Sequence, residues 1–410
     1  MADVNAHRRS VLAKKHNIPE SRVFDSWRSI VSLPTRVADA VAICTPDRDH
    51  SEAAIAFAAL GPSLVLLDFV LTLSRLPHPP GKADGDHAPR MYRIERAVQA
   101  AGVKFAVGHV LRYTARYRAI KEIIDSGAIG PVQSIQHQEP VGFYHFAHSY
   151  VRGNWRNTKE ATFSLMAKSC HDIDIITHLM GGARCRSVSS FGSLRHFKKS
   201  QKPAAAGDAL RCLDCAHERQ CPYSAKRIYL DPTARGEEAF GLHAVTDIAD
   251  IENVADALRT GPYGRCVYES DNDVVDNQVV AMEFEGGQTA AFTMIAFSEA
   301  VCVRKTTVFG TLGEIVSDSD DSVTVYDFVT RKKREVNPAQ TLTSLSGHGG
   351  GDFGLMHAFI SAVANNDAAF LLSGTAETLQ SHSLVFAAEH ARLNRQVVDV
   401  ADFIEKAGAV

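Results

Sequence analysis

The first third of the chain alternates between short apolar runs and amphipathic segments. The runs Ala38–Cys44, Leu64–Leu67 and Val103–Val107 are almost wholly apolar, which is typical of strands buried on both faces of a parallel sheet. Between the first two runs, the Ala-rich segment 51–60 is closed by Gly-Pro and predicts a helix. This alternation predicts a parallel sheet with right-handed crossovers. Further helices are expected at residues 6–16, 25–31 and 113–126.

Beyond about residue 128 the hydrophobic pattern changes to an alternation of period two. Val132–Gln138 alternates apolar and polar positions, as strands with one solvated face do. The segment EGGQ at 285–288 lies between two such runs and predicts a hairpin turn. Other strands are expected at 187–194, 278–284, 289–297 and 306–309, and helices at 162–180, 355–363 and 376–394. We therefore predict an α/β chain with a parallel-sheet domain at 1–128 and a C-terminal α/β domain at 129–410, built on an open, mostly antiparallel sheet.

Charge and composition narrow the class of protein. The 410 residues include 44 Lys and Arg against 47 Asp and Glu, a net charge of −3, which argues against a nucleic-acid partner held by phosphate neutralisation. No stretch approaches the roughly 18 apolar residues that a membrane helix needs, and the basic start has no apolar core of a secretory signal. Eight cysteines are too few for a disulfide scaffold. We expect a cytoplasmic protein with no membrane partner.

Only some elements of a dinucleotide-binding site are found in the sequence. Such a site needs a strand, a Gly-x-Gly-x-x-Gly turn and an acid about 20 residues further on. Asp3, followed by Arg8 and Arg9, matches the end of the acid-bearing strand, so we expect the first strand and its glycine turn to be missing from this sequence. One formal match at 349–354, in HGGGDFG, follows no buried strand. A loop that caps a helix is the preferred interpretation, and a phosphate cradle is the alternative.

Ligands of a parallel domain bind at the carboxyl ends of its strands. Thr45, Pro46 and His50 follow the strand at 38–44 directly. They are candidate cofactor contacts, and an ordinary strand exit with a helix cap is the alternative.

The segment 162–180 holds a second group of ionisable side chains. As a helix, it would place Lys168, His171, Asp174 and His178 within a sector of about 120°, opposite an apolar face. A histidine one turn from a carboxylate can move a proton to or from a substrate hydroxyl near neutral pH. The alternative is a hydrated helix face with ion pairs.

Three cysteines share a spacing that suits a metal. Cys212, Cys215 and Cys221 form C-x2-C-x5-C, and thiolates two residues apart are a natural zinc clip. Structural zinc, buried or free thiols, and a redox pair all remain open. A fourth ligand would come from His217, His196, Cys185 or elsewhere.

Several motifs, in order, resemble one family. ADAVAICTPDRDH, VLL, VKFAVGHVLRY, IDSGAIGPVQSI, GNWRN and CHDIDIITHLMGG resemble the Gfo/Idh/MocA family of NAD(P)-dependent oxidoreductases over nearly the whole chain. The resemblance implies an N-terminal Rossmann domain, here incomplete, and a C-terminal α/β domain whose open sheet often forms homo-oligomers. It also implies hydride exchange between NAD or NADP and a sugar, polyol or similar small hydroxyl compound.

The resemblance also assigns roles to individual residues. His171 matches the active-site histidine and Asp174 the acid three residues after it, while the acid usually found one turn earlier is replaced by Ala167 beside Lys168. The implied catalytic residues are therefore His171, Asp174 and Lys168. The implied cofactor contacts are Asp3 for the ribose, Thr45, Pro46 and His50 at the strand exit, Arg112 in the cleft, and Trp155 and Arg156 near the nicotinamide.

The sequence departs from the family at the catalytic lysine. Where the family has Glu-Lys-Pro after the VLL strand, this chain has Asp68-Phe69-Val70, followed by a Pro-rich stretch at 73–89. Either an error in the gene model hides a complete dehydrogenase, or the chain is a binding or regulatory relative that has lost catalysis. A third interpretation, an NAD-dependent glycoside hydrolase, rests on the glycine-rich loop with His348.

Overall fold

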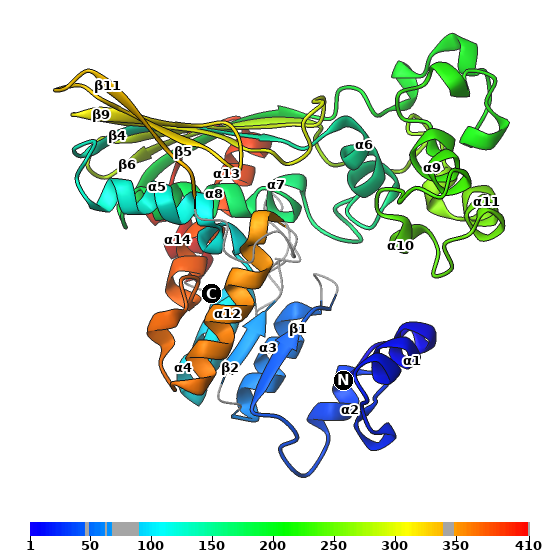
Figure 1. Cartoon of the computed structure of the whole chain (residues 1–410), viewed down its shortest axis with the longest axis horizontal. Coiled ribbons are helices and arrows are strands. Elements are labelled where there is room, and N and C mark those ends of the chain that lie inside the picture. Colours follow the sequence, from blue (N-terminus) through cyan, green and yellow to red (C-terminus); the bar gives the residue numbers. More distant parts are fainter. Residues whose placement is uncertain (46–48, 62–63, 68–89, 339–347, 409–410) are drawn as a thin grey trace.

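A computed structural model describes residues 1–45, 49–61, 64–67, 90–338 and 348–408 (Figure 1). The N-terminal part contains a parallel sheet of β1 (Ala40–Ile43), β2 (Leu64–Leu67) and β3 (Lys104–Val107), in that order. Ile43 lies opposite Leu67, and Leu67 opposite Val107, so the three carboxyl ends are level. The three predicted strands are thus confirmed. The Pro-rich stretch and the lysine position at residue 69 lie outside the described residues.

Helices α3 (His50–Ala59) and α4 (Arg90–Ala101) accompany this sheet. α3 buries Ala53, Ala54, Phe57 and Ala58, which form one stripe at helical spacing. The small alanine side chains let the helix approach its neighbours closely. The predicted helix at 51–60 is therefore confirmed.

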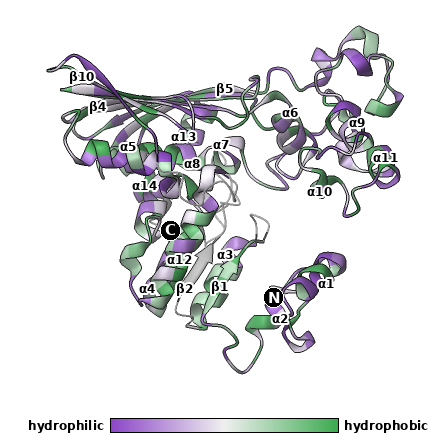
Figure 2. Cartoon of the chain, viewed as in Figure 1, coloured by the Kyte–Doolittle hydropathy of each residue, from purple (hydrophilic) through white to green (hydrophobic). Residues whose placement is uncertain are grey.

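The N-terminal segment makes few contacts with the sheet. α1 (Ala6–Lys15) buries no residue, and much of it carries the hydrophilic colour in Figure 2. α2 (Trp27–Val31) packs Trp27 against Phe57 of α3, with ring centroids 6.3 Å apart. The strand expected to end at Asp3 appears only as an isolated parallel bridge between Ala2 and Phe24.

The C-terminal part is built on a nine-stranded sheet in the order β11-β10-β9-β8-β4-β7-β6-β5-β12. Only β4 and β7 pair in parallel, so the expectation of an open, mostly antiparallel sheet is confirmed. The turn at 285–288 joins β6 to its antiparallel neighbour β7, as predicted. The strands are β4 (Val132–Pro140), β5 (Cys185–Ser193), β6 (Asn277–Phe284), β7 (Thr289–Ile295), β8 (Lys305–Gly310), β9 (Gly313–Ser317), β10 (Val323–Asp327), β11 (Lys332–Val336) and β12 (Val398–Asp399).

Helices cover one face of this sheet (Figure 1). The single helix predicted at 162–180 is wrong, since α7 and α8 are separated at Lys168 and Ser169. The alternative of a hydrated helix face does not hold for α8, because this helix contacts β4 and β7 of the sheet as well as α5 and α13. Its ionisable residues Asp172 and Asp174 are fully buried. The covering helices are α5 (Ala115–Asp125), α7 (Ser164–Ala167), α8 (Cys170–Leu179), α13 (Thr375–Asn394) and α14 (Val400–Gly408).

Residues between β5 and β6 form a lobe of short helices at one end of the long sheet, on the right in Figure 1. It contains α9 (Asp231–Ala234), α10 (Leu242–Val245) and α11 (Ile251–Thr260), with a small core of its own around Tyr229 and Leu258. Before it come α6 (Phe143–Phe146) and a π-helical turn at Ala147–Arg152. Within the described ranges, no helix combines the length and apolar character needed to cross a membrane.

Candidate active site

Buried ionisable residues gather where the carboxyl end of β3 meets α8. His109 and Arg112 follow β3 on the chain, in and just before the 3-10 turn Val110–Tyr113. The ring of His109 lies 5.7 Å from that of His171 on α8 and 5.0 Å from that of His382 on α13. Ligands of open parallel sheets bind at this edge, so this group is the candidate active site.

Arg112 and Asp174 form a buried pair at this edge. The guanidinium donates through Nε and Nη2 to the two carboxylate oxygens of Asp174, at 2.7 and 2.8 Å. Burial opposes ionisation of Asp174, but the neighbouring His109 and Arg112 outweigh it and lower its pKa to about 2. Since burial lowers the pKa of His109, Arg112 supplies the lasting positive charge. The structure thus joins a residue predicted to line the cofactor cleft to one predicted to be catalytic.

Lys168 stands at the break between α7 and α8. Its Nζ lies 3.3 Å from Oε1 of Glu139 on β4 and 3.0 Å from Sγ of Cys302. Burial alone would favour the neutral amine, but the carboxylate of Glu139 raises the pKa of Lys168 above its usual value. Lys168 is therefore a buried ammonium at neutral pH.

A charge network anchors Lys168 and the start of α8 to the sheet. Arg304 Nε lies 3.1 Å from Glu139 Oε2 and 2.6 Å from Asp172 Oδ1. His137 Nε2 lies 3.0 Å from the same oxygen of Asp172. Burial disfavours the Asp172 carboxylate, yet Arg304 lowers its pKa to about 2. The cations Lys168 and Arg304 alternate with the carboxylates of Glu139 and Asp172. The charges of the network therefore compensate one another without solvent.

His171 is buried next to this network, with 4% of its surface exposed. Burial, and then the nearby His109 and Arg304, lower its pKa well below the usual range. His171 is consequently a neutral imidazole, able to accept a proton. His348 and Lys168 also lower the pKa of His171.

The predicted cofactor contacts fall into three places. Thr45 follows β1 at the carboxyl edge, and its Oγ1 is buried with no hydrogen bond to any described residue. His50 begins α3 and is buried, while Pro46 lies outside the described residues. Asp3 lies in the N-terminal segment, where its carboxylate accepts the Asn5 N–H at 2.7 Å.

Trp155 and Arg156 lie beyond the π-helical turn, toward the lobe. The Trp155 ring is 6.1 Å from that of Tyr150. Burial raises the pKa of Tyr150, and the charge of Lys168 opposes this rise. Arg156 is ion-paired with Asp271 and Glu160, both at 2.8 Å.

The glycine-rich segment HGGGDFG begins α12 (Gly351–Ala364). A Cβ on Gly351 would lie 2.5 Å from the carbonyl oxygen of Val110, and one on Gly354 would lie 2.6 Å from that of Tyr113. These two glycines therefore let α12 pack closely on the turn behind the site. His348 precedes the helix and hydrogen-bonds Asp352 at 2.9 Å.

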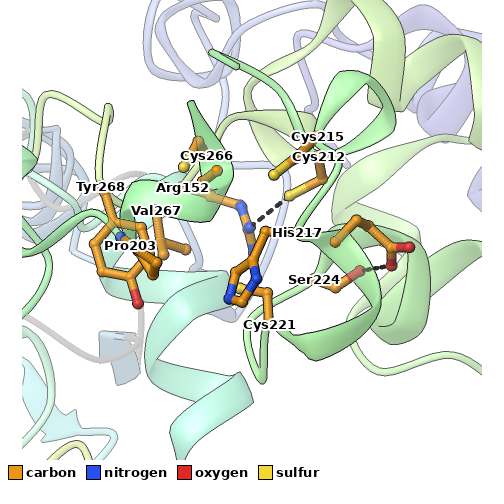
Figure 3. Close-up of a pocket in the computed structure, with 12 residues that line it drawn as sticks. Arg152, Pro203, Cys212, Cys215, His217, Cys221, Ser224, Cys266, Val267 and Tyr268 are labelled. Atoms are coloured by element: carbon orange, nitrogen blue, oxygen red, sulfur yellow. Dashed lines mark hydrogen bonds between the residues drawn. The ribbon is translucent and has the colours of Figure 1, made fainter. Parts of the chain in front are cut away.

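The three spaced cysteines lie in the lobe, apart from His171. Cys212, Cys215 and Cys221 line a cavity of about 20 Å³ together with Cys266 (Figure 3). Throughout the described part of the chain, no three His, Cys, Asp or Glu side chains are placed as a ready metal site. Cys185 instead hydrogen-bonds backbone carbonyls of β5 and β6, and His196 contacts Tyr268.

Several residues of the site have no signal in the sequence. Glu139 and Arg304 occupy positions that read as ordinary members of alternating strands or their ends, and Asp172 lies outside the predicted sector of ionisable residues. Their function depends on pairing across distant segments. Only His109, directly after the buried strand β3, could have been found, by the same carboxyl-end argument that selected Thr45.

A level parallel sheet followed by an open sheet, with histidines and a lysine between them, defines a two-part α/β architecture. Residues 121–400 match the model of the oxidoreductase family's C-terminal alpha/beta domain, GFO_IDH_MocA_C. The chain therefore belongs to the Gfo/Idh/MocA oxidoreductase family.

Individual relatives agree in fold. The Bacillus subtilis (strain 168) protein named "Putative oxidoreductase YteT" is 24% identical over 275 residues, which are 63% of this chain and 60% of that protein. An oxidoreductase from Agrobacterium radiobacter, solved with NAD⁺, L-tartaric acid and magnesium, matches with a TM-score of 0.67 and 13% identity over 98% of this chain and 90% of that one. Levoglucosan dehydrogenase with NADH and levoglucosan matches at 0.66 and 18%, over 97% and 89%.

Proposed function

We propose that the protein oxidises or reduces a hydroxyl carbon of a sugar, polyol or related compound with a nicotinamide cofactor. The observation that carries this proposal is the position of His171 in the first turn of α8, three residues after Lys168, with its ring 5.7 Å from that of His109 at the carboxyl edge of the parallel sheet. Such an edge holds nucleotides in related folds. The solved relatives with NAD⁺ or NADH support the same class of cofactor.

The described residues fit the nicotinamide end of such a cofactor. Thr45 Oγ1 and both ring nitrogens of His109 are buried at the edge, and none of them hydrogen-bonds another described residue. Buried polar atoms of this kind require a partner, which the amide or ribose hydroxyls of a nicotinamide riboside would provide. When bound, the nicotinamide supplies the hydride acceptor or donor.

NAD is preferred over NADP. Arg8 is ion-paired with Asp247 at 3.3 Å, and Arg9 donates to the carbonyl oxygen of Asp3 at 2.6 Å. Both arginines behind Asp3 are thus engaged within the chain, which favours NAD over NADP.

In the proposed reaction His171 takes the proton of the substrate hydroxyl, or returns it in the reverse direction. In its neutral state the ring offers the lone pair that a charged imidazolium lacks, while its lowered pKa makes it a weaker base than a free imidazole. Lys168 donates a hydrogen bond to the same oxygen and stabilises negative charge that develops on it. Lys168 thereby takes the part of the family's lysine, whose position carries Phe69. Asp174 supports the site through Arg112 and His109.

Calorimetric titration of NAD⁺ and NADP⁺ into the folded protein tests the proposal. We expect binding of NAD⁺ in the micromolar range and weaker binding of NADP⁺, and NAD⁺ binding reduced in a Thr45→Val variant. An Asp125→Asn variant, altered on the exposed side of α5, is the matched control. If the folded chain binds neither nucleotide, the proposal is wrong.

We also propose that the open face of the large sheet joins two copies of the chain. Phe191 on β5 and Val279 on β6 lie directly opposite each other and are 67% and 44% exposed. Neighbouring apolar side chains of this size on one face are typical of an interface. Light scattering after gel filtration should give a dimer or larger, and Phe191→Asp should give a monomer.

A further inference from the structure

The lobe between β5 and β6 contains a cluster of thiols that the proposed reaction does not use. Cys212 and Cys215 flank a single 3-10 turn, and Cys221 follows the next one. Cys266 joins them from far along the chain, because its N–H donates to the Leu210 carbonyl at 2.9 Å. A bridge between Arg211 and Arg265 fixes the same approach. The fold therefore brings a fourth thiol to the C-x2-C-x5-C segment.

These four thiols line one small cavity (Figure 3). Its volume of about 20 Å³ exceeds the roughly 10–15 Å³ that a single water-sized occupant requires. None of the four cysteines forms a disulfide in the structure. The cavity thus has room for one ion, with soft ligands around it.

Arg152 supplies a second, independent observation. Its side chain is fully buried and lines the same cavity, and Nη2 donates to Cys212 Sγ at 3.3 Å and to the Tyr223 carbonyl at 2.7 Å. Nε donates to the Arg265 carbonyl at 2.8 Å, while Nη1 has no hydrogen-bond partner among the described residues. Glu218 also lines the cavity, but its carboxylate is bonded by the Ser224 hydroxyl and makes no ion pair with Arg152 in the described part of the chain. A buried guanidinium without a counter-charge is costly. Negative charge in the cavity would compensate it.

We propose that Cys212, Cys215, Cys221 and Cys266 bind one structural zinc ion, with Arg152 as the neighbouring donor that balances its charge. A zinc ion held by four thiolates carries net negative charge and accepts N–H hydrogen bonds at sulfur. In the structure the four thiols are not yet placed to coordinate one metal ion. Zinc binding therefore requires their side chains to rotate toward the centre of the cavity. The binding releases the thiol protons.

A zinc ion would add stability to a lobe whose own core is small. The lobe consists of short helices and 3-10 turns around a small core, and small units of this kind commonly depend on a metal or disulfides. Zinc would join the turn at 212–221 to the strand-like segment at 265–266. The site is separate from the proposed catalytic group, so its test is independent of the nucleotide titration.

Metal analysis of the whole chain, purified without a histidine tag and incubated with zinc before gel filtration, tests the proposal. We expect about one zinc per chain in the wild type and in the control Cys185→Ser, whose thiol lies outside the cavity. Cys212→Ser and Cys266→Ser should lose most of the zinc. In the cobalt-substituted wild type, strong thiolate-to-cobalt absorption should appear and weaken in Cys266→Ser. A wild type well below one zinc per chain overturns the proposal, as does full zinc retention in Cys266→Ser.

Alkylation of the wild type keeps the test decisive if the variants do not fold. With zinc present, iodoacetamide followed by mass spectrometry should leave the four cavity cysteines unmodified, and removal of zinc by a chelator should expose them. Cys44, which is exposed, should react in both samples. Equal labelling of the four with and without zinc contradicts the proposal, and so does a disulfide among them.

Discussion

Replacing Asp174 by Asn tests whether the carboxylate at the candidate site is held by Arg112. The change removes the negative charge that accepts two hydrogen bonds at 2.7 and 2.8 Å from a guanidinium that is 5% exposed. Breaking a buried ion pair leaves the remaining charge uncompensated, which costs about 3–5 kcal/mol. We expect a loss of stability in that range at neutral pH.

The pH dependence of the same variant follows from the pKa. The pKa of Asp174 falls from 3.8 to about 2 on folding, so the ionised carboxylate stabilises the fold above pH 3.8 and this contribution is lost as the pH falls toward 2. At about 1.4 kcal/mol per pKa unit, the full contribution is about 2.4 kcal/mol. Roughly 1 kcal/mol of it disappears between pH 5 and pH 3. Asp174→Asn has no such group, so the difference in the free energy of unfolding between wild type and variant should narrow by that amount from pH 5 to pH 3.

Urea unfolding followed by circular dichroism at pH 7, 5 and 3 measures both quantities. Asp125→Asn is the matched control, because Asp125 pairs with Lys121 on the surface of α5 and is 56% exposed; we expect it to change stability by at most about 0.5 kcal/mol. The double variant Arg112→Met, Asp174→Leu should recover part of the loss, since neither charge remains. If Asp174→Asn costs no more than Asp125→Asn, the buried pair does not hold the site together.

Three further predictions concern the reacting lysine and the packing of α12. Lys168→Met should retain nucleotide binding in calorimetry and lose about 100-fold or more in kcat; unchanged turnover contradicts its role. Glu139→Gln removes the carboxylate 3.3 Å from Lys168 that keeps the pKa of this lysine raised. The alkaline limb of the pH–rate profile should therefore begin to fall at a lower pH than in the wild type. A pH–rate profile checks this, and identical profiles argue against the pairing. Gly354→Ala should destabilise by about 1–3 kcal/mol in thermal unfolding, despite the better helix propensity of Ala, because its Cβ would lie 2.6 Å from the Tyr113 carbonyl oxygen; equal or higher stability refutes the close contact.

Much of the fold can be predicted from the hydrophobic pattern. The pattern places the parallel strands to within two residues, because a short apolar run bounded by turn residues is typical of a strand buried on both faces. It does not predict β9, β10 and β11; β11 reads KKREV, with four charged residues in a row and no apolar alternation. It also does not predict the break at Lys168, because the apolar periodicity continues through both helices around it.

The site is predictable only where a residue follows a recognised element. His171 and Lys168 are found from their place on a predicted helix and from the family resemblance, and the structure places them in one buried group. Their surroundings cannot be found in this way, because Glu139 and Arg304 acquire meaning only when β4 and the start of β8 lie side by side. The same limit applies to Cys266, which reaches the other cysteines through a backbone contact that no spacing reveals.

The central claim is that His171 moves the substrate proton in a nicotinamide-dependent reaction. Its most direct test is the absorbance at 340 nm on mixing the protein and NAD⁺ with a panel of sugars and polyols, for the wild type and for His171→Gln. We expect the wild type to form NADH with at least one of them, and His171→Gln to bind NAD⁺ normally and react at least about 100-fold more slowly. Equal rates in the two proteins, or no NADH from a folded wild type with any of the compounds, would contradict the account.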